Sequence, residues 1–499
     1  MLPPLAAQAG DKFGYHEVRT DSQGGIVPWY GSGPSEAYDH NLRLIWNFWI
    51  TMRNCQNGVP YYLQHQVWKA EADDPRGLGG DQIDMALSSW NLLYGYLGDP
   101  AIKQNMVLMA DYWLDHGMSR PDLLWGNLPY PYDLDVHSGT YDGDMRAGKG
   151  YLQPDKAGSF GAELVMLYKL TGNAKYLDAA TAIANTLAAR VQPGDRDHSP
   201  WPFRVNASTG EVNTQVADGK TWDAAYTSNW SPTLGLFEEL ITLKHGKVAD
   251  YKKAFQTASA WVKAYPLKTN KWGPFFEDID TAHYSDTEIN ADTMAAYILN
   301  HPQWDPDWQK DTLGILNWSY STLANHEFEK WGVIPINEQT QYRVPGNSHT
   351  SRHASVELLY CEKSGDCATK DAAIRRLNWA TYTVDVDGKN RYPRDDIWLT
   401  DGYGDYVRHY LRAMAAAPEL APNDQNHLLR TSSVVQFITY ASDRIEYTKF
   451  DNDSVELLKM GAATPKSVKG GSMNWDPKTK MLTIKANRKQ VTVLCTPAS

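Results

Sequence analysis

Long hydrophobic runs and an excess of positive charge are both missing from this chain of 499 residues. No apolar stretch approaches the roughly 18 residues that a membrane-spanning helix requires. The net charge is −11 at pH 7, whereas a polyanion such as nucleic acid would require a basic surface. The sequence therefore predicts neither a membrane nor a nucleic-acid partner, although one local basic pocket for an acidic ligand stays open.

Cysteine is scarce, with four residues in the whole chain. This number is too small for a dense disulfide framework. Cys361 and Cys367 are close enough in sequence for a bridge, but two free thiols fit the spacing equally well. Cys55 and Cys495 are expected to be small buried side chains.

Several catalytic motifs are also absent. The chain contains no Gly-x-Ser-x-Gly elbow, no Walker A loop and no His-Glu-x-x-His zinc pair, which argues against the chemistries that depend on them. Its glycine-rich segments follow no predicted strand, so nucleotide binding is not expected. We predict no cofactor and no metal. Calcium in the loop at Asp142 and Asp144 is a minor alternative, because Asp-x-Asp spacing suits hard cations.

Trp and Tyr are abundant where Phe is scarce. The chain has 19 Trp and 29 Tyr but only 11 Phe. Core packing alone would favour Phe, whereas Trp and Tyr combine a flat apolar face with a polar edge. Sugars need both, because their C–H faces stack on rings and their hydroxyl groups take hydrogen bonds. The composition favours a saccharide ligand over the plainer interpretation of an aromatic core.

Twelve segments show the apolar periodicity of helices. They repeat as helix, turn, helix and long loop, with connections rich in Gly, Pro, Asp and Trp. Six helical hairpins that close on themselves form an (α/α)6 toroid, which is the predicted, mainly α fold class. A stacked solenoid is the rival architecture, but no fixed repeat period is present. The predicted helices are 38–53, 81–97, 101–116, 158–170, 174–190, 231–244, 249–265, 286–300, 306–323, 350–362, 369–384 and 402–416.

The pattern changes after Pro418 to short alternating segments with β-branched residues, at 433–440, 444–450, 454–458, 480–485 and 490–494. These predict a small antiparallel β domain resembling a sandwich. We expect an extended N-terminal segment (1–37), a catalytic toroid (38–417) and the β domain (418–499). Ala7-Gln8-Ala9 fits the tail of a signal peptide, which predicts a secreted or periplasmic protein.

Aromatic and acidic residues concentrate in the long loops. Glu277 follows a run of aromatic residues, and burial against aromatic rings raises a carboxyl pKa as a general acid requires. A surface acid beside a buried turn is the alternative. Prolines stiffen a second loop, which makes its rings candidates for a sugar platform. The candidate aromatic residues are Trp201, Phe203 and Trp272.

Four aspartates are candidates for holding sugar hydroxyls or activating water. Asp142, Asp144 and Asp155 lie in or beside a glycine-rich loop, where solvated surface charge is the alternative. Asp81 follows Gly79 and Gly80 at the start of a predicted helix, so a helix N-cap explains it equally well.

A further group lies at or near two predicted helix starts. Asn347 and Arg352 have the chemistry to neutralise a carboxylate, and His349 between them can remove a proton. In the segment 401–410, positions three and four apart share one helix face. Phenol groups beside a guanidinium on this face either contact the substrate or pack in the core. The candidates there are Tyr403, Tyr406 and Arg408.

The hairpin count, the aromatic loops and the β domain resemble the six-hairpin (α/α)6 superfamily of carbohydrate-active enzymes, over roughly residues 38–416. That superfamily includes inverting glycoside hydrolases, epimerases and several polysaccharide lyases. Phe275-Phe276-Glu277-Asp278 resembles the segments that carry the general acid in some hydrolases of this fold. Asn347-Ser348-His349 is similar to the Asn/His pair of toroid alginate-type lyases, with an extra Ser between the two.

The first functional hypothesis is therefore an inverting glycoside hydrolase acting on a polysaccharide or oligosaccharide. Glu277 would be the general acid, and one of Asp81, Asp142, Asp144 and Asp155 the base, with carboxyl groups roughly 6.5–9.5 Å apart.

The alternative is a polysaccharide lyase that acts on a uronate polymer by β-elimination. Asn347 and Arg352 would neutralise the substrate carboxylate and His349 would be the base, with Tyr403 or Tyr406 as the acid. A glycan-binding protein without activity is the third hypothesis.

Overall fold

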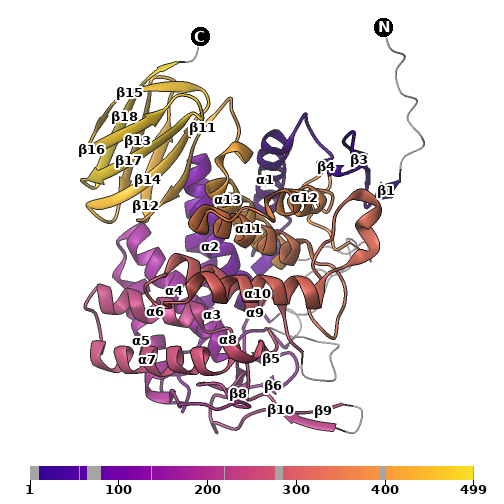
Figure 1. Ribbon diagram of the computed structural model, residues 1–499. Coiled ribbons are helices and arrows are strands. Elements are labelled where there is room, and N and C mark those ends of the chain that lie inside the picture. The colour runs from indigo at the N-terminus through magenta and orange to yellow at the C-terminus, as the bar shows by residue number, and fades with distance from the viewer. Residues whose placement is uncertain are drawn as a thin grey trace.

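The computed structural model describes residues 11–55, 57–63, 80–135, 138–217, 220–275, 285–393 and 400–497. Within these ranges, long helices form an inner and an outer layer, and antiparallel strands follow them (Figure 1). The mainly α fold class with a C-terminal antiparallel β domain is thus confirmed. None of the helices in the described ranges combines the length and the hydropathy needed to cross a membrane.

Every second long helix belongs to an inner ring. Each inner helix packs against the next, and the last packs against the first. Helix α11 shows why these helices belong inside, because it is buried on all its faces over most of its length. In order, the inner helices are α2 (Gly80–Leu97), α4 (Pro154–Thr171), α6 (Ser231–Thr242), α9 (Glu288–Asn300), α11 (Asn347–Ser364) and α13 (Thr400–Ala416).

The outer helices are amphipathic. In α5 the buried residues Tyr176, Ala180, Ile183 and Leu187 recur every three or four positions, which forms one apolar stripe facing the ring. The outer helices are α1 (Pro34–Thr51), α3 (Pro100–His116), α5 (Ala174–Arg190), α7 (Val248–Ala264), α10 (Trp308–Leu323) and α12 (Lys370–Thr381). The short helices are α8 (Pro266–Thr269), η1 (Tyr61–Leu63), η2 (His326–Trp331) and η3 (Pro418–Leu420).

Helix α13 closes the ring against α2. The Ser89 hydroxyl donates a hydrogen bond to the backbone carbonyl of Gly404, although 315 residues separate the two. A Cβ atom on Gly404 would lie 2.9 Å from the backbone nitrogen of Ala86. This distance is shorter than the contacts that Cβ atoms make with other heavy atoms. Glycine at this position therefore permits the close packing of the first and last inner helices. The closed ring excludes the open solenoid that the sequence left as a rival.

Short connections join the first five inner helices to the outer helices that follow them. After α4, Gly172 adopts a left-handed conformation with φ of 75°, which ends the helix. The side chain of Asn173 then accepts a hydrogen bond from the Lys175 backbone and starts α5. This pair of caps places α4 and α5 antiparallel, as the sequence predicted for this hairpin.

The β domain consists of two four-stranded antiparallel sheets, with strand orders β11-β14-β17-β16 and β12-β13-β18-β15. Alternate residues of β13 and β17 are buried, and the two sheets form a sandwich (Figure 1). Strand β11 contacts α2 and α13, and β12 contacts α4. The strands are β11 (Asn426–Thr431), β12 (Val435–Tyr440), β13 (Arg444–Lys449), β14 (Asp453–Met460), β15 (Ala463–Lys469), β16 (Gly471–Asp476), β17 (Met481–Asn487) and β18 (Gln490–Pro497).

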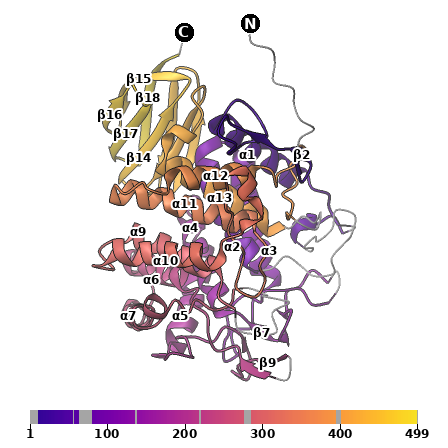
Figure 2. The same ribbon diagram turned by 45° about the vertical axis from the view of Figure 1, so that its right-hand side comes forward.

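Short antiparallel strand pairs lie in the long loops and near the N-terminus. The hairpins of the loops lie on the side of the ring away from the sandwich (Figures 1 and 2). The pairs are β1 (Lys12–Phe13) with β2 (His16–Glu17), β3 (Arg19–Thr20) with β4 (Ile26–Val27), β5 (Gly143–Asp144) with β6 (Gly148–Lys149), β7 (Tyr151–Leu152) with β8 (Val205–Asn206), and β9 (Thr214–Ala217) with β10 (Lys220–Asp223).

Three predicted helix starts are three or four residues too late, and one of them is that of α1, which begins at Pro34 where the sequence predicted 38. Helix α4 begins at Pro154 and α11 at Asn347, where the sequence predicted 158 and 350. The polar first turns of both helices concealed their starts from a periodicity search. Asp155, Asn347 and His349 therefore belong to the first turns of inner helices, where their positions are fixed by the ring.

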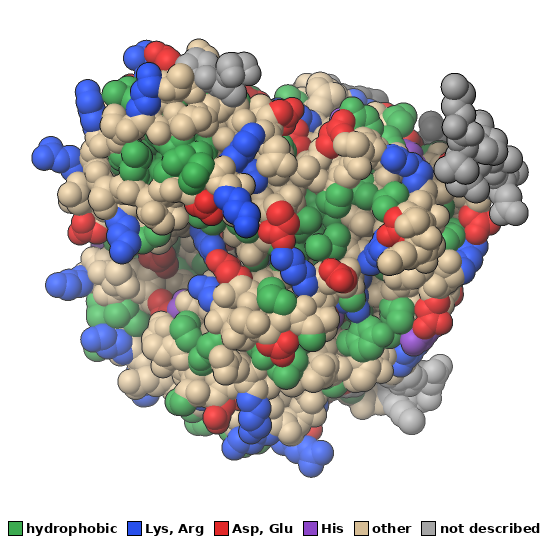
Figure 3. Space-filling view, turned by 45° about the horizontal axis from the view of Figure 1, so that its top comes forward, with side chains coloured by type: hydrophobic (Ala, Val, Ile, Leu, Met, Phe, Trp, Pro, Cys, Tyr) green, Lys and Arg blue, Asp and Glu red, His purple; other side chains and the backbone are tan. Residues whose placement is uncertain are grey.

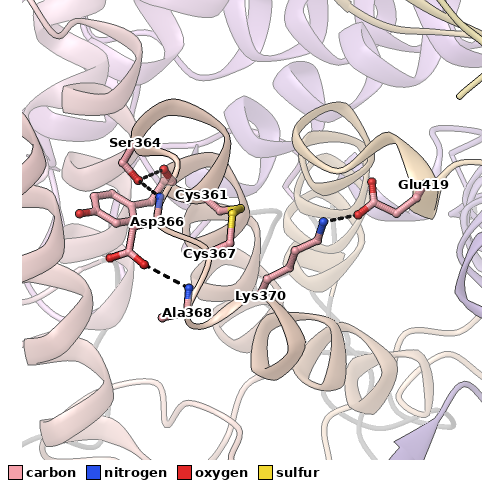
Figure 4. Close-up of a disulfide and its surroundings, with 8 residues drawn as sticks. Cys361, Ser364, Asp366, Cys367, Ala368, Lys370 and Glu419 are labelled. Carbon is pink, nitrogen blue, oxygen red and sulfur yellow. Dashed lines mark hydrogen bonds and ion pairs between the residues drawn. A yellow bond between two sulfur atoms is a disulfide. The ribbon is translucent and has the colours of Figure 1, made fainter. Parts of the chain in front are cut away.

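A disulfide joins Cys361 near the end of α11 to Cys367 in the turn before α12 (Figure 4). It spans six positions of sequence. The ion pair between Lys370 of α12 and Glu419 of η3 lies beside it in the same view. The pairing that the sequence left open is therefore present, and it braces one inner helix against its outer partner.

Candidate active site

The N-termini of the inner helices lie together at one end of the ring. Short connectors make each outer helix antiparallel to its inner partner, so all inner helices run in one direction. The long segments 52–79, 117–153, 191–230, 265–287, 324–346 and 382–399 lead into these N-termini. The partial positive charge of helix N-termini favours carboxylates there. Glu288 is the first residue of α9 and Asp155 the second of α4.

His349 and Glu288 form a hydrogen-bonded pair at this end. The Nδ1 atom of His349 lies 2.9 Å from Oε2 of Glu288. The Glu288 side chain is fully buried, whereas that of His349 is 12% exposed. The Nε2 atom of His349 has no hydrogen-bond partner within the described ranges. It is also not among the buried atoms of these ranges that lack a partner, so it is accessible to solvent. Because the carboxylate accepts the Nδ1 hydrogen, a neutral ring presents Nε2 as a proton acceptor.

A chain of buried charges continues from this pair into the ring. Arg352 donates to Glu288 Oε2 through Nη1 and to Asp405 Oδ2 through Nη2, both at 2.5 Å. Asp405 also accepts a hydrogen bond from Arg408, whose Nη1 lies 3.0 Å from the hydroxyl of Ser88. The charges alternate in sign, so each buried ion has a compensating partner.

The pKa values follow from this alternation. Burial lowers the pKa of His349, but the hydrogen bond to Glu288 and the charge of Glu338 outweigh it, so the pKa is raised. Burial raises the pKa of Glu288 more than Arg352 lowers it. For Asp405, burial is outweighed by the charges of Arg352 and Arg408, which hold the pKa of this carboxyl well below its usual value. The raised pKa of His349 keeps its imidazole a group that exchanges a proton near neutral pH.

Two further polar contacts lie beside the pair. The Tyr392 hydroxyl donates to Glu338, whose backbone carbonyl accepts from the Glu288 nitrogen at 3.1 Å. Asn347 donates to the side chain of Asn390, and the Asn390 backbone donates to the hydroxyl of Tyr403. Of the predicted site residues, the structure therefore links His349, Arg352 and Arg408 through Glu288 and Asp405, and it links Asn347 to Tyr403 through Asn390.

Another polar cluster occupies the first turn of α4, three helices away around the ring. Asp155 and Lys156 are fully buried and form an ion pair of 2.6 Å. Asn229 donates to the same Asp155 oxygen at 2.9 Å, and the Lys156 ammonium lies 3.5 Å from the centre of the Phe275 ring. Asp155 is therefore held by two donors, and its charge is compensated by an adjacent lysine.

The other predicted aspartates of this region have structural contacts. Asp144 is buried and accepts from Gln153, from Arg204 and from two backbone nitrogens. Asp142 pairs with Lys149 at 2.9 Å. No group of three or more His, Cys, Asp or Glu side chains that could hold a metal ion occurs in the described ranges. The charge of Asp144 is compensated by the buried Arg204.

The aromatic residues predicted as a sugar platform lie in the core. Trp201 packs against Trp230, with ring centres 4.8 Å apart, and its indole donates to the Leu187 carbonyl. Side chains with no exposed surface present no face to a ligand, so stacking by these rings requires that the loops move. The predicted aromatic residues with essentially no exposed surface are Trp201, Phe203, Trp272, Tyr403 and Tyr406.

Two predicted site residues fall outside what the structure describes. Glu277, the predicted general acid, lies in the undescribed stretch 276–284. Asp81 belongs to helix α2, but its side chain is outside the described part.

Several charged residues of the ring were missed by sequence reasoning. Glu288 and Asp405 lie inside segments that were correctly predicted as helices, but nothing local distinguishes them. Asp84 is buried, and desolvation raises its pKa to about 7 despite Arg408 and Lys156. A usable signal exists in α11, where His349, Arg352 and His353 recur at helical spacing on a helix that is otherwise buried.

Comparison with known proteins places the fold. No family model matches the sequence, and no curated protein matches it in sequence. A cellobiose 2-epimerase from Spirochaeta thermophila matches in structure with a TM-score of 0.58 and 12% identity, over 78% of this chain and 97% of that chain. A D-mannose isomerase matches with a TM-score of 0.53 and 8% identity, over 77% and 99%.

A family 76 glycoside hydrolase from a bovine Bacteroides thetaiotaomicron strain matches with a TM-score of 0.50 and 10% identity, over 77% of each chain. At these identities the likeness concerns the fold alone. It confirms the predicted (α/α)6 toroid fold, and it assigns no individual family or reaction.

Proposed function

We propose that this protein is a carbohydrate-active enzyme that rearranges a sugar by moving a proton on a carbon beside the carbonyl group. One observation carries the proposal: His349 presents an unbonded Nε2 at the end of the ring that receives the long loops, while Glu288 holds Nδ1 at 2.9 Å. A histidine oriented by a carboxylate is a general acid–base group that works near neutral pH.

The chemistry follows from this pair. Nε2 of neutral His349 takes the proton from C2 of an open-chain aldose, and the C–H electron pair moves toward C1 as the carbonyl oxygen becomes negatively charged. The buried Glu288 carboxylate stabilises the imidazolium that forms. For a ketose, the O2 proton moves to O1 of the enediolate and the carbon-bound proton returns to C1. For the epimer, the intermediate turns about its C2–C3 bond and the proton returns to C2 on the other face. No external oxidant or reductant is needed.

Two solved structures of this fold support the substrate class. Their names describe a cellobiose 2-epimerase and a D-mannose isomerase, both of which rearrange sugars. Because the identities are 12% and 8%, the names suggest which sugars to test first, and the His349–Glu288 pair of this chain carries the chemical argument.

The elimination hypothesis gains less support. It requires Arg352 to neutralise a substrate carboxylate, but both terminal nitrogens of Arg352 already bind Glu288 and Asp405. Asn347 donates to Asn390 in the same way. A uronate would therefore have to displace buried ion pairs, which costs several kcal/mol.

Hydrolysis by an inverting mechanism is the second candidate, and Asp84 favours it. Its pKa of about 7 suits a general acid, and its Oδ1 atom has no hydrogen-bond partner in the described part of the chain. In this version Glu277 and Asp84 are the carboxyl pair to test on an oligosaccharide. The glycan-binding hypothesis rests on the Trp and Tyr content alone.

A single assay in D₂O separates these functions. The protein is incubated with D-mannose, D-glucose, cellobiose and a uronate polymer, and the products are followed by proton NMR. Rearrangement incorporates deuterium at C2 or C1 and gives a new sugar, hydrolysis releases reducing ends without exchange, and elimination gives a vinylic proton. The proposal is wrong if no sugar exchanges its proton, or if His349→Ala exchanges as fast as the native protein.

We also propose that the protein works in an oxidising compartment, outside the cytoplasm. The disulfide between Cys361 and Cys367 supports this location, because such bonds persist in secreted and periplasmic proteins. Retention of the free thiols in protein isolated from its native cells would contradict it.

A further inference from the structure

A cavity lies among the inner helices of the ring. Its volume is about 430 Å³, within the range of small-molecule sites. Side chains of all six inner helices line it, including Ser231 at the start of α6 and Arg352 in the first half of α11. Leu429, Arg430 and Thr431 of strand β11 form the wall on the sandwich side. Figure 3 shows the surface hollowed between the sandwich and the helices, left of centre, with acidic, basic and histidine side chains gathered around the hollow.

Arg412 of α13 is the cation that this cavity leaves available. Its side chain lines the cavity and is exposed to solvent there. It forms no hydrogen bond and no ion pair with any residue that the structure describes. The guanidinium of Arg412 is charged at neutral pH, as arginine side chains in proteins are.

The other basic side chains of the cavity already have acidic partners. Arg408 binds Asp405, Arg430 binds Glu362, and His301 lies 3.4 Å from Glu238. Arg352, deeper in the ring, binds Glu288 and Asp405. Their charges are compensated, so Arg412 stands apart from them.

Glu163 of α4 faces the same cavity and does not neutralise Arg412 by contact. It forms no ion pair within the described ranges. Burial and the charge of Asp84 raise the pKa of Glu163 to about 8. Its carboxyl group is therefore largely protonated at neutral pH and offers a hydrogen-bond donor beside the guanidinium.

We propose that this cavity binds a small oxyanion-bearing molecule, with Arg412 as the anchoring cation and Glu163 as a neighbouring donor. An unpaired guanidinium in a cavity recognises carboxylate and phosphate groups, because its fork of N–H donors matches two oxygens. The volume of about 430 Å³ admits a molecule the size of a monosaccharide derivative. Strand β11 of the sandwich walls the cavity on one side, and Arg352, which binds Glu288, also lines it.

The proposal gives the sandwich a role in ligand binding in addition to packing, because residues of β11 line the cavity. It also predicts communication between the cavity and Glu288, because Arg408 lines the cavity and binds Asp405, which binds Arg352 beside Glu288. The proposal does not rest on the proposed reaction, because occupancy of the site is measured without any activity assay.

Isothermal titration calorimetry of the full chain with inorganic phosphate and with D-glucuronate tests the site, with D-glucose as the neutral probe. We expect at least one anion to bind saturably and D-glucose not to bind there. Arg412→Gln should weaken anion binding at least about tenfold, the loss of one charge-assisted contact. Binding of glucuronate alone indicates an organic carboxylate, and binding of phosphate indicates a phosphorylated ligand. The exposed Arg444 on β13 is the matched control, and Arg444→Gln should bind as the native protein does.

Gly235→Leu tests the same site by shape and without any change of charge. Gly235 of α6 lines the cavity, and an added Cβ meets no atom within 4 Å. The longer side chain should fill the cavity and weaken anion binding, and replacing glycine inside a helix does not oppose folding. The proposal is overturned if the native protein binds neither anion. It is also overturned if Arg412→Gln and Gly235→Leu both bind anions as tightly as the native protein does.

Discussion

The imidazole of His349 and the carboxylate of Glu288 meet at 2.9 Å although 61 residues separate them in the chain. Each belongs to the first turn of an inner helix, α11 and α9. Because those helices are adjacent in the ring, the pair depends on the closed fold and on no local motif. The functional proposal depends on this contact.

Replacing the histidine should remove the activity. His349→Ala should lower kcat/KM by about a hundredfold or more, the usual contribution of a general acid–base group. Steady-state kinetics on the sugar identified in the D₂O assay provide the measurement. The matched control is His326→Ala, because His326 lies on the surface and pairs with Glu329. A His349→Ala enzyme with native kinetics would place the chemistry elsewhere.

The rate should depend on pH with the sign set by His349. Its pKa is raised above the ordinary value of about 6.5, and only the neutral ring accepts a proton. The value of kcat/KM should therefore rise with pH through that raised pKa. In Glu288→Gln the carboxylate that raises the pKa is gone, so burial should shift the rise to lower pH. A profile that Glu288→Gln leaves in place would show that Glu288 does not position the histidine.

The same pKa shift affects stability. A histidine whose pKa is raised on folding stabilises the native state below the unfolded pKa, and this contribution is lost as the pH rises through the folded pKa. Urea unfolding of the native protein and His349→Ala should therefore differ most in acid and converge at higher pH. A difference that grows with pH would have the wrong sign for this pair.

Asp405 should be important for stability. Asp405→Asn removes the carboxylate that lies between Arg352 and Arg408, leaving two buried cations with less compensation. We expect the free energy of unfolding to fall by about 3–5 kcal/mol, measured by urea unfolding. Asp122→Asn breaks an exposed pair with Arg120 and should leave stability nearly unchanged. Equal effects of the two substitutions would contradict the buried network.

The disulfide should contribute modestly. It closes a short loop of six positions between Cys361 and Cys367, for which the chain-entropy model gives about 2 kcal/mol. Replacing both cysteines by serine should lower the free energy of unfolding by this amount, and the variant should no longer respond to a reducing agent. The bond is unimportant if reduction leaves the unfolding curve of the native protein in place.

Glu277→Gln separates the two leading functions. It should abolish activity if the chain hydrolyses glycosidic bonds, and leave deuterium exchange largely intact if His349 is the base. Product analysis by NMR reads both outcomes from one sample.

The helices could be predicted because their signal is local. A periodic apolar stripe such as that of α5 appears in any window of the chain, and the alternation of β13 does the same for a strand. Strand β16 lacked this signal, since it is an edge strand whose residues are mostly exposed. The starts of α4 and α11 were missed because their first turns are polar, which is the property that places them in the candidate site.

The candidate site could be predicted only in part. His349 and Arg352 stand out because polar residues of these types begin a buried helix. Glu288 gives no such signal, because its importance comes from a partner on another helix. Asp144 misled the prediction for the opposite reason: its loop looks chemically rich, but Arg204, distant in sequence, compensates the charge.

The contact between Ser89 and Gly404 has a consequence for biosynthesis. The inner ring stays open until the ribosome has synthesised α13, because Gly404 follows Ser89 by 315 residues. Until then the apolar flank of α2 that faces α13 is uncovered, and a nascent chain stalled before residue 400 would be a substrate for chaperones and proteases. Chains truncated before residue 400 should consequently have no partial activity.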